Sequence, residues 1–323
     1  MASIPAYPAI PDDIAAQPKY AVIGGSGVTV AGEERFSFKT PLGYLINISF
    51  LDEAKRVVFV NRHLCTAMDA EGKATYAPPH AVDFHVIMIG LKKLNVKSVC
   101  AIGSTGSLRP DEVPVGSIVM PDDYAFVLPA PVTFWGKLPM GAFAPEFTQE
   151  GKIHFAPASA DDKQWVSFRQ WVQQTLHPVL AAHQGKIKLA PGQEGVWPCV
   201  GSTEVGNDVK VAYVQTSGPR FETRAEIQVY KNLGHVVGMT CSAEWTLAQV
   251  CVRAIVAVCQ TSVRHTLAHA ASGVFAPPLA SLLASRSCSV LLSCACAGAG
   301  TVRGVKLLGT SDCLPASRIT SNP

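Results

Sequence analysis

The chain has 323 residues, of which 48% are hydrophobic and 16% charged, a composition that excludes a disordered or collagen-like protein. The net charge of +3 hides an asymmetry, because residues 1–246 hold 21 basic and 23 acidic side chains whereas residues 247–323 hold six and one. Neither part has the clustered Lys and Arg of a nucleic-acid binder, so we expect no nucleic-acid partner.

The sequence gives no targeting or membrane signal. The N-terminus, MASIPAYPAIPDD, lacks a basic region followed by an apolar one. Charge-free stretches near the C-terminus are either broken by Pro277-Pro278 or too short and too rich in Ser and Cys for a transmembrane helix. We therefore expect a cytoplasmic protein with reduced cysteines and no membrane contact.

In chain order, short apolar runs alternate with helical patterns. Pro78-Pro79-His80 is typical of the start of a helix, as is Asp161-Asp162, and residues 125–160 read as a long loop. This alternation predicts an α/β domain with a largely buried parallel or mixed sheet. The predicted strands are Tyr20–Gly24, Arg56–Asn61, Ser98–Ile102, Gly116–Met120, Lys210–Gln215 and His235–Gly238.

The composition changes near Leu247. Beyond it lie six cysteines, ten serines and one acidic residue, and only the run Val252–Val258 resembles a strand. We divide the chain into an N-terminal extension (1–18), an α/β domain (19–250) and an atypical low-complexity segment (251–323). For the last segment a shifted reading frame, alternative splicing and a divergent, inactive protein are all open.

Four loops that follow predicted strands could bind a ligand. Gly24-Gly25-Ser26-Gly27 could bring backbone N–H groups and the Ser26 hydroxyl to an anion, or could be a plain tight turn. The full dinucleotide fingerprint is absent, which argues against an oxidoreductase. Arg62-His63 could grip a phosphate through the guanidinium fork, or could be a solvated pair.

The other two loops carry hydroxyls and an aromatic side chain. Gly103–Leu108 (GSTGSL) could let a ligand lie against the backbone, although an ordinary turn fits equally well. Residues 217–226 (SGPRFETRAE) present Phe221 after a Gly-Pro turn, either as a stacking platform or as part of the core. Residues 238–244 (GMTCSAE) follow the next predicted strand.

In this order, GGSG, RH, YAPPHAVDF, GSTGSL, GPRFETRAE and GMTCSAEWTLAQ resemble the nucleoside phosphorylase family over roughly residues 20–250, and most closely its trimeric branch. The resemblance implies a single-domain, three-layer α/β fold in which helices flank a mixed central β-sheet. It also implies a homotrimeric pentosyltransferase of purine salvage, with phosphate as a co-substrate and no metal or organic cofactor.

Carried over by position, the resemblance implies a phosphate site and a nucleoside site. Met239 would lie under the ribose with Glu244 nearby as a supporting residue, and Phe221 against the purine. Thr105 would contact the nucleoside, and His154 the 5′ substituent. The implied phosphate ligands are Ser26, Arg62, His63, Ser104 and Thr240.

The sequence departs from the family where the purine is protonated. The family places an Asp or Asn after the helix that follows the Met-Thr pair, but Val250–Gly273 contains neither. Thr261 and Ser262 stand about there, and a hydroxyl is a poor general acid. We expect phosphorolysis of 5′-methylthioadenosine; the alternatives are a 6-oxopurine nucleoside phosphorylase and an inactive phosphate or nucleoside binder.

A metal site is not expected. His265 and His269 have helical spacing, but HTLAH lacks the Glu of a zinc protease, and no third ligand is evident.

Overall fold

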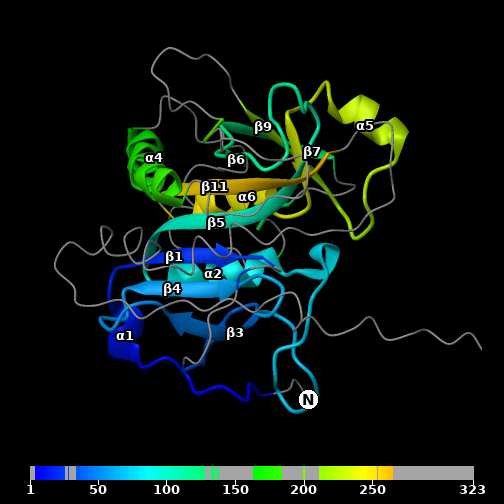
Figure 1. Ribbon diagram of the computed structural model, residues 1–323. Helices are drawn as coiled ribbons and strands as arrows, with labels where there is room; N and C mark the ends of the chain where they lie inside the picture. Colours follow the sequence, from blue (N-terminus) through cyan, green and yellow to red (C-terminus); the bar gives the residue numbers. More distant parts are fainter. Residues whose placement is uncertain are drawn as a thin grey trace, which may run out of the picture.

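The computed structural model describes residues 4–25, 28, 34–127, 132–134, 137, 163–183, 199–200, 211–252 and 254–264. These residues form a mixed β-sheet with helices against both of its faces, as the sequence predicted (Figure 1). The first half of the chain contributes α1 (Asp12–Ala16), β1 (Lys19–Gly24), β2 (Phe36–Thr40), β3 (Gly43–Phe50), β4 (Val57–Asn61), the 3₁₀ turn η1 (Pro79–Ala81), α2 (Phe84–Lys93) and β5 (Val96–Ser107).

The chain after β5 completes the sheet. Its elements are β6 (Ile118–Val119), β7 (Asp123–Val127), α4 (Lys163–His183), β8 (Cys199–Val200), β9 (Ala212–Thr216), α5 (Arg224–Tyr230), β10 (Val236–Gly238), α6 (Cys241–Cys251) and β11 (Ala254–Arg264). The main path runs β2-β3-β4-β1-β5-β10-β9-β7. From it, β11 pairs with both β5 and β6, and β6 pairs with β8.

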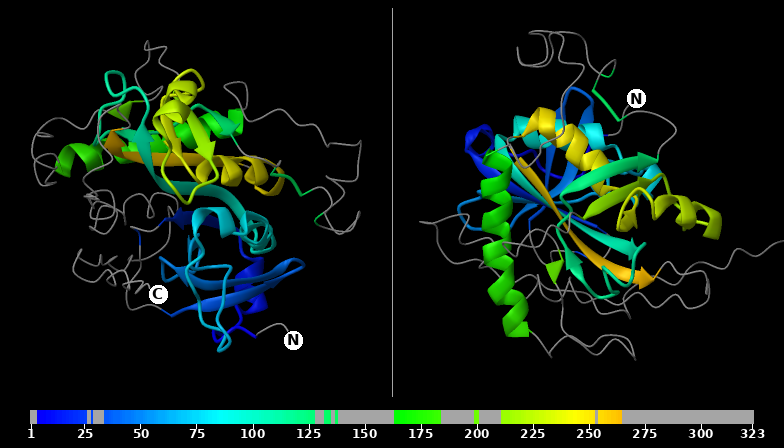
Figure 2. Two further views of the ribbon diagram at one scale, coloured as in Figure 1. Left: turned by 90° about the vertical axis from the view of Figure 1, so that its right-hand side faces the viewer. Right: turned by 90° about the horizontal axis from the view of Figure 1, so that it is seen from above.

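Three layers follow from the alternation of side chains along the strands. In β1, Ala21 and Ile23 pack in the core with α2 and α6, while in β4 Val57 and Phe59 pack in the core with Val172 of α4. Figure 2 shows the consequence from above, with α4 on one side of β11 and α6 on the other.

All six predicted strands occur, but β5 is longer than expected. Gly103–Ser107, read from the sequence as a loop, continues the strand, because Gly103–Thr105 pair with β11 and Gly106–Ser107 with β10. The predicted helices are α2, preceded by η1, and α4. Most of the loop predicted over residues 125–160 lies outside the described residues.

The sheet reaches past both ends of the domain predicted over residues 19–250. Ile10 and Ala15 of the predicted extension are buried in the core. At the other end, β11 begins two residues after the predicted strand-like run Val252–Val258 begins, and it pairs in parallel with β5 from Ala254 to Arg264. The fold therefore takes in Cys251, at the end of α6, and the eleven residues of β11 from the segment with atypical composition.

Candidate active site

The ends of β1 and β4 are joined by Asn61, the last residue of β4. Its amide nitrogen donates to the carbonyls of Gly25 (3.3 Å) and Val28 (3.0 Å), and its amide oxygen accepts from the backbone N–H of His63 (3.0 Å). The glycine turn is thereby fixed beside Arg62. We did not identify Asn61 from the sequence; its signal is a polar residue at the end of an apolar strand. Ser26 lies outside the described residues.

Arg62 is buried where β4, β5 and α6 meet. Its Nε and Nη2 donate to the two carboxylate oxygens of Glu244 at 2.6 and 3.0 Å, and its Nη1 donates to the carbonyl of Ile102 at 2.8 Å. A methyl group on Gly25 would lie 2.8 Å from Nη1, so the guanidinium also borders the glycine turn. Three of the five guanidinium N–H groups are used within the described residues, which leaves two for a ligand.

Glu244 is fully buried in α6, and the guanidinium takes both of its oxygens. Burial alone would lower the pKa of Arg62, but the charge and hydrogen bonds of Glu244 outweigh burial and raise it above its ordinary value. Burial raises the pKa of Glu244 against the opposing charge and hydrogen bonds of Arg62. The two short, parallel N–H···O contacts are those of a charge-assisted pair, so we take both groups as ionised and the pair as close to neutral overall. A ligand at this point meets directed N–H groups rather than a large uncompensated charge.

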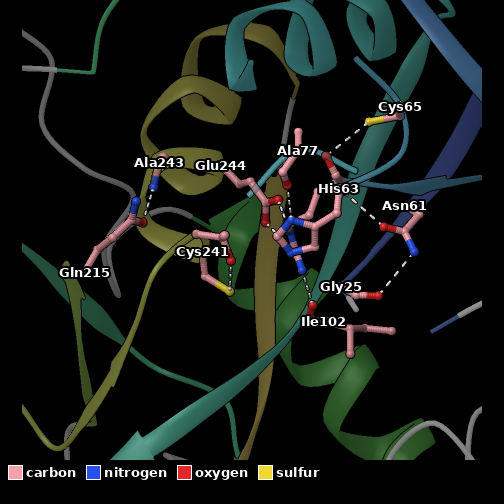
Figure 3. Close-up of polar contacts among 12 residues, drawn as sticks. Gly25, Asn61, His63, Cys65, Ala77, Ile102, Gln215, Cys241, Ala243 and Glu244 are labelled. Carbon is pink, nitrogen blue, oxygen red and sulfur yellow. Dashed lines mark hydrogen bonds and ion pairs between the residues drawn. The ribbon is translucent and has the colours of Figure 1, made fainter. Parts of the chain in front are cut away.

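His63 is held beside Arg62 by its own ring contacts. Nδ1 lies 2.8 Å from the carbonyl of Ala77 (Figure 3). The ring also stacks on Tyr76, at 5.1 Å between centroids. Burial lowers the pKa of His63 below 6.5, and the charge of Arg62 lowers it further against the opposing effect of Ala77. We place the proton of the neutral ring on Nδ1, because a carbonyl can only accept, so Nε2 is the acceptor.

The two hydroxyls of β5 differ in exposure. Ser104 is exposed, whereas Thr105 is buried and its hydroxyl donates to the carbonyl of Gln260 at 3.3 Å. Ser104 lies two residues beyond Ile102, whose carbonyl binds Arg62. The roles predicted for Ser104 and Thr105 stay predictions.

Thr240 is the residue immediately before α6 and is buried, and its hydroxyl makes no capping bond to the helix. A methyl group on Gly103 would lie 2.8 Å from Sγ of Cys241, which shows how closely α6 begins against β5. Thr240, Glu244 and Arg62 therefore belong to one cluster at the strand ends.

Met239 and Phe221 lie on the loops next to this cluster. A methyl group on Gly218 would lie 2.6 Å from Sδ of Met239 and 3.4 Å from Cβ of Pro79, so the loops around these three residues meet. Phe221 is 58% exposed, so it does not belong to the core. Arg220 beside it forms a double ion pair with Glu226 at 2.7 and 2.8 Å.

The part of the chain that the structure describes does not identify an acid for the purine. Thr261 is buried, and its hydroxyl donates to the carbonyls of Pro114 (2.8 Å) and Ser117 (3.1 Å), so its proton is committed to the backbone. The side chain of Ser262 and all of His154 lie outside the described residues.

The described residues contain no group of three or more His, Cys, Asp or Glu side chains that could hold a metal ion. Within the same residues, no helix is long and apolar enough to cross a membrane.

Comparison with known proteins supports one family. The sequence profile described as "Phosphorylase superfamily" matches residues 19–273. A probable S-methyl-5′-thioinosine phosphorylase of Methanopyrus kandleri is 30% identical over 234 residues, 71% of this chain and 72% of the relative. An S-methyl-5′-thioadenosine phosphorylase of Hyperthermus butylicus is 29% identical over 269 residues, 80% of this chain and 79% of the relative.

A third relative and a solved structure are also phosphorylases by name. The 6-oxopurine nucleoside phosphorylase of Pyrococcus furiosus is 27% identical over 237 residues, 72% of this chain and 74% of the relative. Methylthioadenosine phosphorylase from Schistosoma mansoni, in complex with tubercidin, superposes with a TM-score of 0.59 at 21% identity, covering 88% of this chain and 93% of that one. At this identity the likeness is one of fold.

Proposed function

The chain belongs to the phosphorylase superfamily, and from this premise we propose that it splits a purine nucleoside with phosphate, its preferred substrate being 5′-methylthioadenosine. The products are the free purine and 5-methylthioribose-1-phosphate. The observation that carries the proposal is the meeting of β1, β4, β5 and the start of α6 at the buried Arg62. Relatives named for S-methyl-5′-thio nucleosides support the choice of substrate.

The proposed phosphate ligands suit the chemistry. Ser26, Arg62, His63, Ser104 and Thr240 hold the phosphate, and the guanidinium contributes its two remaining N–H groups. Fixing the phosphate turns a bimolecular encounter into a positioned one, and its negative charge stabilises the ribose as it becomes an oxocarbenium ion. Since Nε2 of neutral His63 is an acceptor, it accepts a hydrogen bond from the hydroxyl group of a hydrogen phosphate.

The proposed nucleoside contacts come from the neighbouring loops. The exposed ring of Phe221 stacks on the purine, and Met239 lies under the ribose with Glu244 and Thr105 nearby. His154 contacts the 5′ substituent. We further propose a cytoplasmic homotrimer active in purine salvage, with no metal or organic cofactor; light scattering of the purified chain tests the trimer, and turnover after chelator treatment tests the cofactor.

Two other functions have specific support. The 6-oxopurine nucleoside phosphorylase among the relatives favours inosine as substrate. The absence of Asp and Asn from Val250–Gly273, together with the commitment of Thr261 to backbone carbonyls, favours a protein that binds phosphate and nucleoside without turnover.

The decisive assay measures phosphate-dependent release of purine from 5′-methylthioadenosine, S-methyl-5′-thioinosine and inosine, using the purified full chain with its mass verified. We expect turnover to be fastest with 5′-methylthioadenosine. Turnover of inosine alone would favour the 6-oxopurine alternative. No turnover of any nucleoside, with phosphate still raising the melting temperature, would favour the inactive binder.

Arg62→Lys tests the phosphate site within the same assay. Lysine keeps a charge opposite Glu244 but loses the planar fork, so we expect the KM for phosphate to rise about tenfold or more. Arg109→Ala is the control, because Arg109 is partly exposed and pairs with Glu112 at 3.4 Å. An unchanged KM for phosphate in Arg62→Lys would remove Arg62 from the site.

A further inference from the structure

The helix α6 begins without the cap that its sequence offers. The residue before a helix, when it is Thr, usually accepts a hydrogen bond through its hydroxyl from the N–H of the second or third helical residue. Thr240 occupies this position, yet its side chain makes no such bond. The N–H groups at the start of α6 are bound instead by side chains from β9.

Two residues of β9 provide these acceptors. Oε1 of Gln215 accepts from the N–H of Ala243, the third residue of α6, at 2.8 Å (Figure 3). The hydroxyl oxygen of Tyr213 accepts from the N–H groups of Thr240 (3.3 Å) and Cys241 (3.4 Å). Tyr213 and Gln215 are both 2% exposed and stand two residues apart, so they project from the same face of β9.

The hydroxyl of Tyr213 fits at the start of α6 only because residue 238 is a glycine. A methyl group on Gly238, at the end of β10, would lie 2.2 Å from the hydroxyl oxygen of Tyr213. Any other residue there would displace the tyrosine from the start of α6. The contact between β9 and α6 is therefore built from three positions, Tyr213, Gln215 and Gly238.

We infer that Gln215 and Tyr213 are positioning residues, which cap α6 from β9 and thereby leave the hydroxyl of Thr240 available to the phosphate. The inference rests on the proposed function. Gln215 occupies the N–H that a capping Thr at position 240 would bind, and Thr240 has φ −141° and ψ −39° instead of the extended conformation of a cap. Within the described residues, the side-chain contact of the Thr240 hydroxyl is a weak one, 3.9 Å to Sγ of Cys241.

The inference makes an unusual prediction for Gln215→Met, which removes the acceptor and keeps a similar volume. The Thr240 hydroxyl then turns to the free N–H of Ala243 and caps the helix itself. Stability changes little because one cap replaces another, but the phosphate loses a ligand. We expect the KM for phosphate to rise about tenfold, with kcat at saturating phosphate and the KM for nucleoside within about twofold.

A double-mutant cycle with Thr240→Ala separates this inference from a general loss of packing. Because both single variants remove the same hydroxyl from the phosphate, the double variant should raise the KM for phosphate no further than Thr240→Ala alone. Gln228→Met, on the exposed face of α5, is the matched control and should behave as the unmodified chain. Gln215→Leu repeats the test if methionine prevents folding.

Amide hydrogen exchange without ligands gives a readout that needs no activity. The N–H of Ala243 should stay protected in Gln215→Met and in Thr240→Ala, where one acceptor remains, and should exchange much faster only in the double variant. This pattern would support the replacement of the Gln215 cap by the Thr240 hydroxyl, whether or not the chain turns over a nucleoside.

The experiments distinguish failure of the proposed function from failure of the inference about Gln215 and Tyr213. If the unmodified chain turns over no nucleoside, the proposed function fails, and the inference is decided by amide exchange and by phosphate-dependent stabilisation of the same variants. The inference is overturned if Gln215→Met leaves phosphate binding unchanged, if its effect adds to that of Thr240→Ala, or if it raises the KM of both substrates equally.

Discussion

The ion pair of Arg62 and Glu244 is buried, so the loss of either charge leaves the other one uncompensated in the folded chain. Glu244→Gln removes the charge opposite a guanidinium whose side chain is only 2% exposed. We expect the free energy of unfolding to fall by about 3–5 kcal/mol, because an uncompensated buried charge is costly. Urea unfolding measures this loss.

Glu112→Gln is the matched control for that substitution. Glu112 pairs with Arg109, but the two side chains are 48% and 35% exposed, so water screens the interaction and we expect a change of about 0–1 kcal/mol. Equal losses in the two variants would mean that the charge of Glu244 is not compensating Arg62 in the folded chain.

His63 gives the stability of the protein a pH dependence. Its pKa is lowered by burial, so below pH 6.5 the unfolded chain binds a proton that the folded chain does not, and the free energy of unfolding decreases as the pH falls through this range. Urea unfolding between pH 7.5 and 5 should show a smaller decrease in His63→Gln than in the unmodified chain.

His235, whose pKa burial also lowers, contributes in the same direction. His235→Gln should therefore reduce the slope as well, and the double variant should reduce it further than either single variant. Carboxyl groups such as Glu226, with a pKa lowered to about 2 by Arg220 and backbone contacts, act at lower pH. An unaltered slope in His63→Gln would contradict the lowered pKa.

Among the elements, β5 shows what the sequence could and could not predict. The apolar run Ser98–Ile102 was identified as a strand from its composition alone. The small residues that follow read as a loop, because their partners in β10 and β11 are about 130 residues or more away in the chain and leave no local pattern. The hydrogen bond between Gln215 and Ala243 spans only 28 residues, but it too joins separate elements and leaves no local pattern.

The close packing of α6 on β5 predicts a conflict at Gly103. A methyl group there would lie 2.8 Å from Sγ of Cys241, so Gly103→Ala should lower the free energy of unfolding by about 1–3 kcal/mol. Cys241→Ala removes the sulfur. In the Cys241→Ala background, Gly103→Ala should therefore lower the free energy of unfolding by much less than it does in the unmodified chain. Thermal or urea unfolding of the four proteins measures the coupling, and simple additivity would show that the sulfur is not the obstacle.

For the whole molecule, the least predictable feature is the extent of the sheet. The strand-like run Val252–Val258 was visible in the sequence, yet the loss of acidic residues beyond Leu247 placed the predicted boundary before it. The composition of a segment reflects only residues that are neighbours in the sequence. In contrast, β11 is held in the sheet by two strands that are distant in the sequence, β5 and β6. In addition, Nε1 of Trp165 in α4 donates to the carbonyl of Ile255 at 2.9 Å. The match of the family profile as far as residue 273 agrees with this position.

Ile255→Ala tests whether the chain depends on β11. The side chain is 2% exposed in the core shared with α2 and α6, so its truncation should lower the free energy of unfolding by about 2–5 kcal/mol. Val229→Ala on α5 is the control, because Val229 is 57% exposed and we expect a change within about 0.5 kcal/mol.

The comparison separates two accounts of the C-terminal segment. If Ile255→Ala destabilises the chain as expected, the phosphorylase fold extends through β11, and any shift of reading frame or splice junction must lie beyond that strand. If it behaves like Val229→Ala, β11 does not contribute to the folded core, the fold ends near residue 250 as the composition suggests, and the missing purine acid belongs to a segment that has been replaced.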